Sequence, residues 1–223
     1  DYAAKVAKRS MALNLAPPLP HTRGIAALGQ VGVQQVGDVL EGHGENDDAI
    51  DALEQQVGHE VMRLALKGPL ARDLRELLAA LRVASDIEPI GDYAANVAKR
   101  SMALNLAPPL PHTRGIAALG QLAVQQVRDV LEAYRDNDGD AAQRVRNRDA
   151  ELDTLYTGLF RELLTYMMED ARAITPCTHL LFMGKNLEHI GDHATNIAEN
   201  VWFLVHGDDL LPPREKRDAT NTA

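Results

Sequence analysis

Apolar residues recur every three or four positions over most of the chain, which is the spacing of one face of an α-helix. The pattern is clearest in one run of each half: Leu74, Leu77, Leu78, Leu81, Ile87 and Ile90, then Leu180, Leu181, Leu187 and Ile190. Alternating runs rich in Val, Ile, Thr and aromatic residues, which are typical of strands, are almost absent. The pattern predicts an all-α protein.

Glycine and proline clusters divide this pattern into six helices. The breaks fall at 42–47, 67–71, 106–112, 134–140 and 167–176, and they leave helices near 22–42, 47–67, 70–105, 113–134, 140–168 and 171–206. This order predicts two tandem antiparallel three-helix bundles, one over 22–106 and one over 113–206, joined by a Pro-rich linker at 107–112. Residues 207–223 are polar and interrupted by prolines, so we expect a disordered tail.

The chain repeats itself in two ways. The phrase "DIEPIGDYAAN" at 86–96 returns as "NLEHIGDHATN" at 186–196, and a much closer copy relates 1–41 to 92–132, with 37 of 41 positions identical. The start of that copy has no place in a three-helix core, so we expect an extra N-terminal helical segment over 1–21. Because the two halves have otherwise diverged, so close a copy is either a recent duplication or an error of sequence assignment.

Composition narrows the class of protein. The 223 residues are 45% hydrophobic but include only three Phe and one Trp, so the core must be built from Leu, Ala, Val and Ile, as in helix bundles. A formal net charge of −9 argues against nucleic acid or an anionic membrane as the general partner. The single Cys177 leaves no internal disulfide and is expected to be a small buried side chain. With no signal-peptide pattern and no apolar run near the roughly 18 residues of a transmembrane helix, we expect a cytoplasmic protein.

Acidic residues are paired four positions apart, which places both members of a pair on one helical face. The pairs occur in the same order in each half: Asp47 with Asp51 and Glu88 with Asp92, then Asp149 with Asp153 and Glu188 with Asp192. Asn96 and Asn196 lie one turn beyond the later pairs. An antiparallel bundle can bring the four carboxylates of a half together, and such a group needs a cation or basic side chains. Solvated acidic faces explain single pairs, but the matching order favours a metal site in each half.

Residues within the repeated phrase distinguish the two halves. His189 and His193 have a spacing that can hold Zn²⁺, but the first half has Pro89 and Tyr93 in their places. Since the histidine pair is not repeated, we expect partly buried or surface histidines in preference to ligands. Pro89 removes a backbone N–H, so it predicts a kink in its helix and a distorted first metal site.

The ordered acidic pairs, together with "IGDYAANVAK" and "IGDHATNIAE" in the long third helices, make the chain from about 22 to 206 resemble the PhoU family. The resemblance implies a cytoplasmic regulator, not an enzyme, that couples a phosphate ABC transporter to a sensor histidine kinase and restrains phosphate-starvation transcription. It implies membrane association only through these partners, with a homodimer as one possible assembly. It also implies bound metal ions, iron first, with zinc, manganese, magnesium or calcium as alternatives.

Carried over by position, the resemblance assigns metal ligation to the paired acids and, more weakly, to an asparagine: Asp47, Asp51, Glu88, Asp92, Asp149, Asp153, Glu188, Asp192 and Asn196. Helix–helix hydrogen bonding explains Asn96 and Asn196 equally well.

Two other functions stay open at this level. A ferritin-like di-metal oxidase would be built from Glu ligands and E-x-x-H motifs on four helices. The chain contains no E-x-x-H. A passive helical adaptor with solvated acidic faces and no metal is the other alternative.

Overall fold

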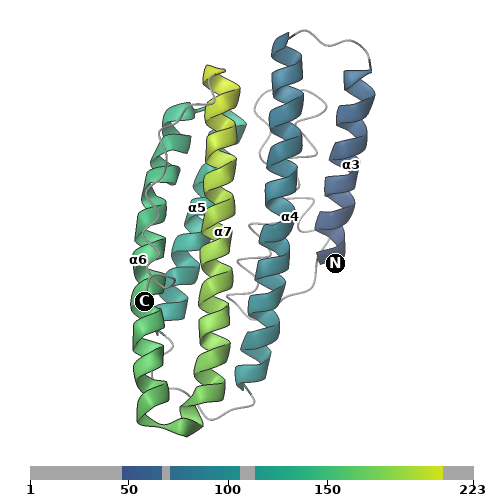
Figure 1. Ribbon diagram of the computed structural model, residues 1–223. Helices are drawn as coiled ribbons and strands as arrows, with labels where there is room; N and C mark the ends of the chain where they lie inside the picture. Colours follow the sequence, from purple (N-terminus) through teal and green to yellow (C-terminus); the bar gives the residue numbers. More distant parts are fainter. Residues whose placement is uncertain (1–46, 67–70, 106–113, 208–223) are drawn as a thin grey trace, which may run out of the picture.

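The computed structural model describes residues 47–66, 71–105 and 114–207. They form long helices, which Figure 1 shows lying side by side along one direction. The helices are α3 (Asp47–Ala65), α4 (Ala71–Asn105), α5 (Arg114–Asp136), α6 (Gly139–Glu169), the short 3₁₀ helix η1 (Ala171–Ala173) and α7 (Ile174–His206). No strand occurs in the described ranges. The all-α prediction is therefore confirmed, with helix ends within a few residues of those expected.

Several predicted segments lie outside the described residues. They are the extra segment at 1–21, the helix at 22–42, the linker at 107–112 and, except for Gly207, the tail at 207–223. Inside the described ranges, α4 continues as one helix through Pro89. The proline therefore does not end the helix that it was predicted to kink.

Local chemistry fixes the ends of the helices in the second half. Asn137 has a left-handed φ of 52°, and the Asp138 side chain accepts a hydrogen bond from the Ala141 N–H at 2.9 Å, which caps the start of α6. At the end of α7, Gly207 has a φ of 69° and donates its N–H to the Phe203 carbonyl at 2.8 Å. A left-handed residue after the last turn is a common helix stop, and glycine adopts it without a steric penalty.

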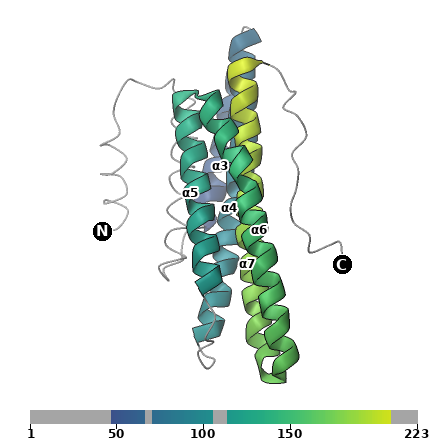
Figure 2. The same ribbon diagram turned by 90° about the vertical axis from the view of Figure 1, so that its left-hand side faces the viewer.

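The two halves of the chain pack on each other through α4 and α7. The Arg100 guanidinium lies 4.2 Å from the Phe182 ring centroid, and that of Arg75 lies 6.0 Å from the Phe203 ring. The later residue of α4, Arg100, contacts the earlier residue of α7, Phe182, so the two helices run antiparallel. In Figure 2, which turns the molecule by 90°, α5 and α6 cover the side of α7 that faces away from α3.

One apolar core joins both halves. Its pattern follows the repeat, because the buried positions of α4 return 100 residues later in α7 (177 − 77). The buried pairs are Leu77 and Cys177, Ala80 and Leu180, Val83 and Met183, Ile87 and Leu187, Ile90 and Ile190, Ala94 and Ala194, and Val97 and Ile197. The positions between these buried residues recur in the same register, and they include the acidic pairs of both helices. In the parts of the chain described, no helix has a stretch long and apolar enough to span a bilayer.

Candidate metal centre

The acids of the second half lie on α6 and α7, which pack closely together. Asp149 and Asp153 come from α6, and Glu188 and Asp192 come from α7. The first three are 2%, 2% and 3% exposed, and Asp192 is partly buried. Buried carboxylates are rare because an ionised oxygen loses most of its hydration, so each needs positive charge or hydrogen bonds around it.

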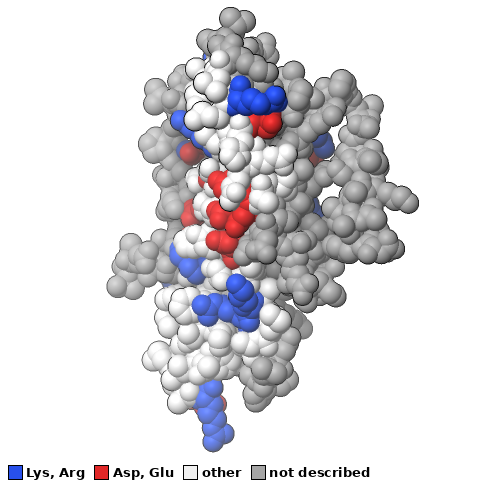
Figure 3. Space-filling model, turned by 90° about the vertical axis from the view of Figure 1, so that its right-hand side faces the viewer, with Lys and Arg blue, Asp and Glu red and all other residues white. Residues whose placement is uncertain are grey.

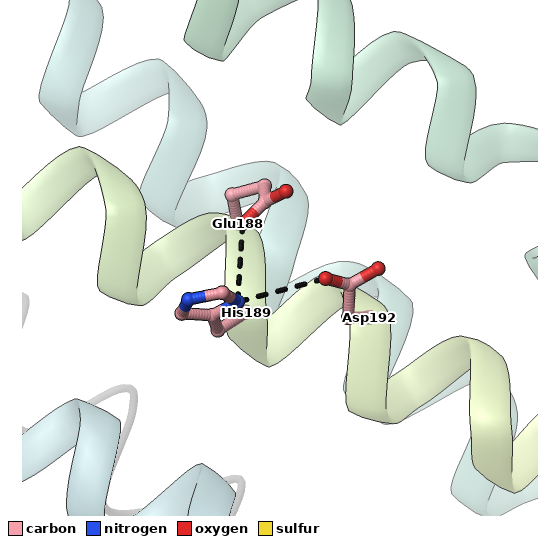
Figure 4. A group of neighbouring side chains, drawn as sticks. All are labelled: Glu188, His189 and Asp192. Carbon is pink, nitrogen blue, oxygen red and sulfur yellow. Dashed lines mark ion pairs between the residues drawn. The ribbon is translucent and has the colours of Figure 1, made fainter. Parts of the chain in front are cut away.

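Three side chains of α7 converge on one point. The His189 Nδ1 lies 3.2 Å from the Glu188 Oε2 and 3.6 Å from the Asp192 Oδ2 (Figure 4). Ligand atoms of these three residues lie within 4.8 Å of one another, and no other group of this kind occurs among the residues that the structure describes. Two carboxylates and an imidazole suit iron, manganese or zinc. The donor set therefore fits a metal ion of the kind expected.

His189 changes the interpretation of the histidine pair. As expected, both His189 and His193 are partly buried. The structure adds that the Nδ1 of His189 faces two carboxylates (Figure 4). A histidine one position after Glu188 can bind the same metal ion as Glu188. Neighbouring side chains point about 100° apart around the helix, but these two are long enough to converge. The position of His189 next to Glu188 was thus more informative than its i, i+4 spacing from His193.

The Glu188 carboxyl is buried among charged neighbours, and its pKa is raised above the usual value. Burial raises its pKa, and the charge of Asp192 adds to that rise. The Lys185 ammonium, 2.8 Å from Oε2, and the nearby His189 act in the opposite direction without cancelling it. A bound cation would favour the ionised form of Glu188 in the same way as Lys185 does, only more strongly.

Gly191 allows α6 to approach this group. A Cβ at Gly191 would overlap the Leu152 Cδ2 and would lie 3.0 Å from the Gln126 Oε1 and 3.2 Å from the Asp149 Oδ1. The absence of a side chain therefore lets Asp149 reach the turn of α7 that joins Glu188 to Asp192. This close contact explains why a glycine stands inside a long helix, where it costs about 1 kcal/mol relative to alanine.

The first half presents its acids differently. Asp47 begins α3, where Asp51 is exposed, while on α4 Glu88 is partly buried and Asp92 is exposed. These described side chains do not form a three-residue ligand group like that on α7. Figure 3 faces the side of the molecule on which α3 and α4 lie. Asp and Glu side chains gather midway along this side, with Lys and Arg side chains above and below them. The first half thus offers an acidic surface more than a preformed centre.

Asn196 is engaged in a contact between the halves. Its Nδ2 donates to the Asp86 Oδ1 of α4 at 3.1 Å, and the Asn200 Nδ2 donates to the Asp86 Oδ2 at 3.3 Å. The His193 Nδ1 also lies 3.1 Å from the Asp86 Oδ1. Of the two explanations offered for Asn196, the geometry favours helix–helix hydrogen bonding. Sequence reasoning missed Asp86, although it stands two turns before Tyr93 on the same face of α4.

Gln126 of α5 is a second residue that sequence reasoning missed. It is 1% exposed, and neither its Oε1 nor its Nε2 has a hydrogen-bond partner. It occupies a position in the apolar stripe formed by Leu119, Ala123 and Val130, all fully buried. A polar residue at the spacing of a buried face was the available signal.

We expect Gln126→Met to stabilise the metal-free protein by about 1 kcal/mol, because an unpaired buried amide costs more than an apolar side chain of similar shape. Urea unfolding of the unaltered chain and the variant, both in chelator, measures the difference. A loss of stability would show that the Gln126 amide has a partner in solution.

The family model of the PhoU domain matches residues 37–101 and 116–201, one match in each half of the chain. The chain belongs to the PhoU family. It is 69% identical over 176 residues to a protein of Xylella fastidiosa named phosphate-specific transport system accessory protein PhoU homolog, covering 79% of this chain and 73% of that protein. A Rhizobium meliloti protein of the same name is 42% identical over 214 residues and is matched over 90% of both chains.

Solved PhoU structures share this fold. The crystal structure of PhoU from Pseudomonas aeruginosa matches with a TM-score of 0.81 and 32% identity, over 84% of this chain and 96% of that one. The structure of the phosphate transport system regulatory protein PhoU from Streptococcus pneumoniae matches with a TM-score of 0.76, over 86% and 96% of the two chains. At 22% identity, the second comparison supports the fold alone. The PhoU resemblance predicted from the repeated motifs is confirmed.

Proposed function

We propose that this PhoU-family chain is the accessory regulator of a phosphate-specific transport system. It acts in the cytoplasm as a negative regulator of phosphate-starvation signalling, coupling a phosphate ABC transporter to a sensor histidine kinase. It reaches the membrane through these partners and performs no catalytic step. The observation that carries this proposal is the 69% identity, over 176 residues, to a protein named as such an accessory protein.

The regulator also binds metal. Glu188, His189 and Asp192 hold the tighter ion, and the support is the convergence of their ligand atoms on α7. Asp149 approaches the same turn of α7 from α6, where Asp153 is also buried. A weaker site uses the acids of the first half, Asp47, Asp51, Glu88 and Asp92, whose described members are more exposed. Iron is the first choice of metal. When bound, the ion supplies positive charge that offsets the repulsion between neighbouring carboxylates.

Deleting the gene tests the regulatory role. We expect transcription of phosphate-responsive genes to rise in phosphate-replete medium, because the signal that restrains the kinase is lost. A reporter fused to such a promoter measures the change, and a plasmid-borne copy should restore repression. If transcription stays at its repressed level in the deletion strain, the regulatory role is wrong and the passive adaptor becomes the better description.

A further inference from the structure

We propose that Tyr93, on α4 of the first half, is a positioning residue for the metal centre on α7. The first half of the chain then sets the metal affinity of the second. This inference rests on the proposed metal centre and adds to it a residue from the other repeat.

The Tyr93 ring lies against both histidines of α7. Its centroid is 5.1 Å from that of His189 and 5.8 Å from that of His193, with interplanar angles of 34° and 35°. The two imidazoles stand one turn apart, so a single ring packs on both. Tyr93 is itself partly buried against the common core, which limits its own movement.

This contact restricts the orientation of His189. The Nδ1 of His189 faces Glu188 and Asp192, at 3.2 Å and 3.6 Å, while its ring packs on Tyr93. A side chain that is 36% exposed and lies on a helix surface would otherwise sample several rotamers. Holding it in the orientation that presents Nδ1 reduces the ordering needed when metal binds. Residues that orient a ligand commonly change metal affinity by 10–100-fold.

Asp86 holds the two helices in the register that this contact requires. It receives hydrogen bonds from Asn196 and Asn200 and pairs with His193, all on α7. These bonds stand on the same side of α4 as Tyr93, two turns earlier in the helix. They prevent α4 from sliding along α7 and moving the ring away from His189.

The coupling works in both directions. If packing of Tyr93 on His189 favours metal binding, metal binding must favour that packing by the same factor. A metal ion on α7 therefore tightens the contact between the two repeats. The second repeat cannot supply this function to the first in the same way, because the position of His189 is occupied there by Pro89.

The test measures the affinity of the full-length protein for Mn²⁺ alone, by calorimetric titration after removal of bound metal. We expect Tyr93→Ala to weaken binding about tenfold. Tyr93→Phe keeps the ring and should bind like the unaltered chain. Tyr93→Leu keeps apolar bulk in place of the ring, which guards against a simple packing defect in the alanine variant, and it should also bind about tenfold more weakly.

The matched control is Arg100→Ala. Arg100 also joins α4 to α7, by its contact with the Phe182 ring at 4.2 Å, but it lies two turns from Tyr93, and Phe182 is not a candidate ligand. We expect its Mn²⁺ affinity to be unchanged. A metal-induced rise in Tm should be smaller for Tyr93→Leu than for Arg100→Ala, since only the former uncouples the ring from the centre.

The outcomes separate the two proposals. If the unaltered chain does not bind Mn²⁺, the metal centre on α7 is wrong and this inference falls with it. If the unaltered chain binds and Tyr93→Ala and Tyr93→Leu bind equally well, the inference alone is overturned. Equal weakening in Arg100→Ala would also overturn it, because the effect would then belong to helix packing in general.

Discussion

Replacing Asp192 with asparagine is expected to weaken metal binding at least tenfold, whereas Asp92→Asn leaves the tighter binding step almost unchanged. The two residues occupy equivalent positions 100 residues apart (192 − 92). Asp192 belongs to the group with Glu188 and His189, while Asp92 is exposed and joins no such group among the described residues. Loss of a charged ligand removes both a bond and a charge from the centre, and each tenfold change corresponds to about 1.4 kcal/mol.

Metal content after purification without chelator, followed by titration of the metal-free chains, measures both variants. Asp92→Asn is the matched control because it makes the same chemical change on the equivalent helix. Equal losses in the two variants would contradict the ranking of the sites. No loss in either would show that the acidic pairs are solvated faces.

Gly191→Ala is expected to destabilise the fold by up to about 2 kcal/mol, against the usual preference of helices for alanine. The added methyl group would overlap Leu152, which is fully buried, and would press on Gln126 and Asp149. Overpacking of this kind costs about 1–3 kcal/mol, while the helix propensity gained returns about 1 kcal/mol. The displacement of Asp149 should lower metal affinity as well.

Gly158→Ala on α6 is the control for this substitution. Nothing lies within 4 Å of a Cβ at Gly158, and the residue is exposed. Here the helix propensity acts alone, so we expect a gain of about 0.5–1 kcal/mol. Urea unfolding of both variants in chelator should show opposite signs. A gain in both would mean that α6 and α7 can separate at Gly191 without loss.

The helices could be predicted because residues near their ends determine where they begin and stop. Pro and Gly clusters mark the breaks, and the prediction placed the start of α6 at 140 where the structure has Gly139. The kink expected at Pro89 stays a prediction, but the proline does not end α4, which continues through it and packs along α7. Tertiary contacts of this extent can outweigh the loss of one hydrogen bond.

The candidate site was predictable only within single helices. Spacing of four residues identified Glu188 and Asp192, because both lie on one face of one helix. The residues that meet across two helices could not be predicted, because the pattern within one helix does not say which residues of a neighbouring helix it contacts. Asp86 and Tyr93 were missed for that reason. Gln126 was visible as a polar residue in an apolar stripe, but its proximity to Asp149 and Gly191 depends on how α5, α6 and α7 meet.

The antiparallel contact of α4 with α7 resembles the interface of a symmetric homodimer of single repeats. Tyr93 lies against His193, the residue at its own position in the other repeat (193 − 93), as happens beside the two-fold axis of a homodimer. An ancestor with one repeat, dimerising through this helix, would have made each contact twice with identical side chains. A single chain that carries both repeats is free of that requirement. One repeat can then carry Tyr93 and Asp86 while the other carries His189 and His193, an asymmetry that a symmetric homodimer does not allow.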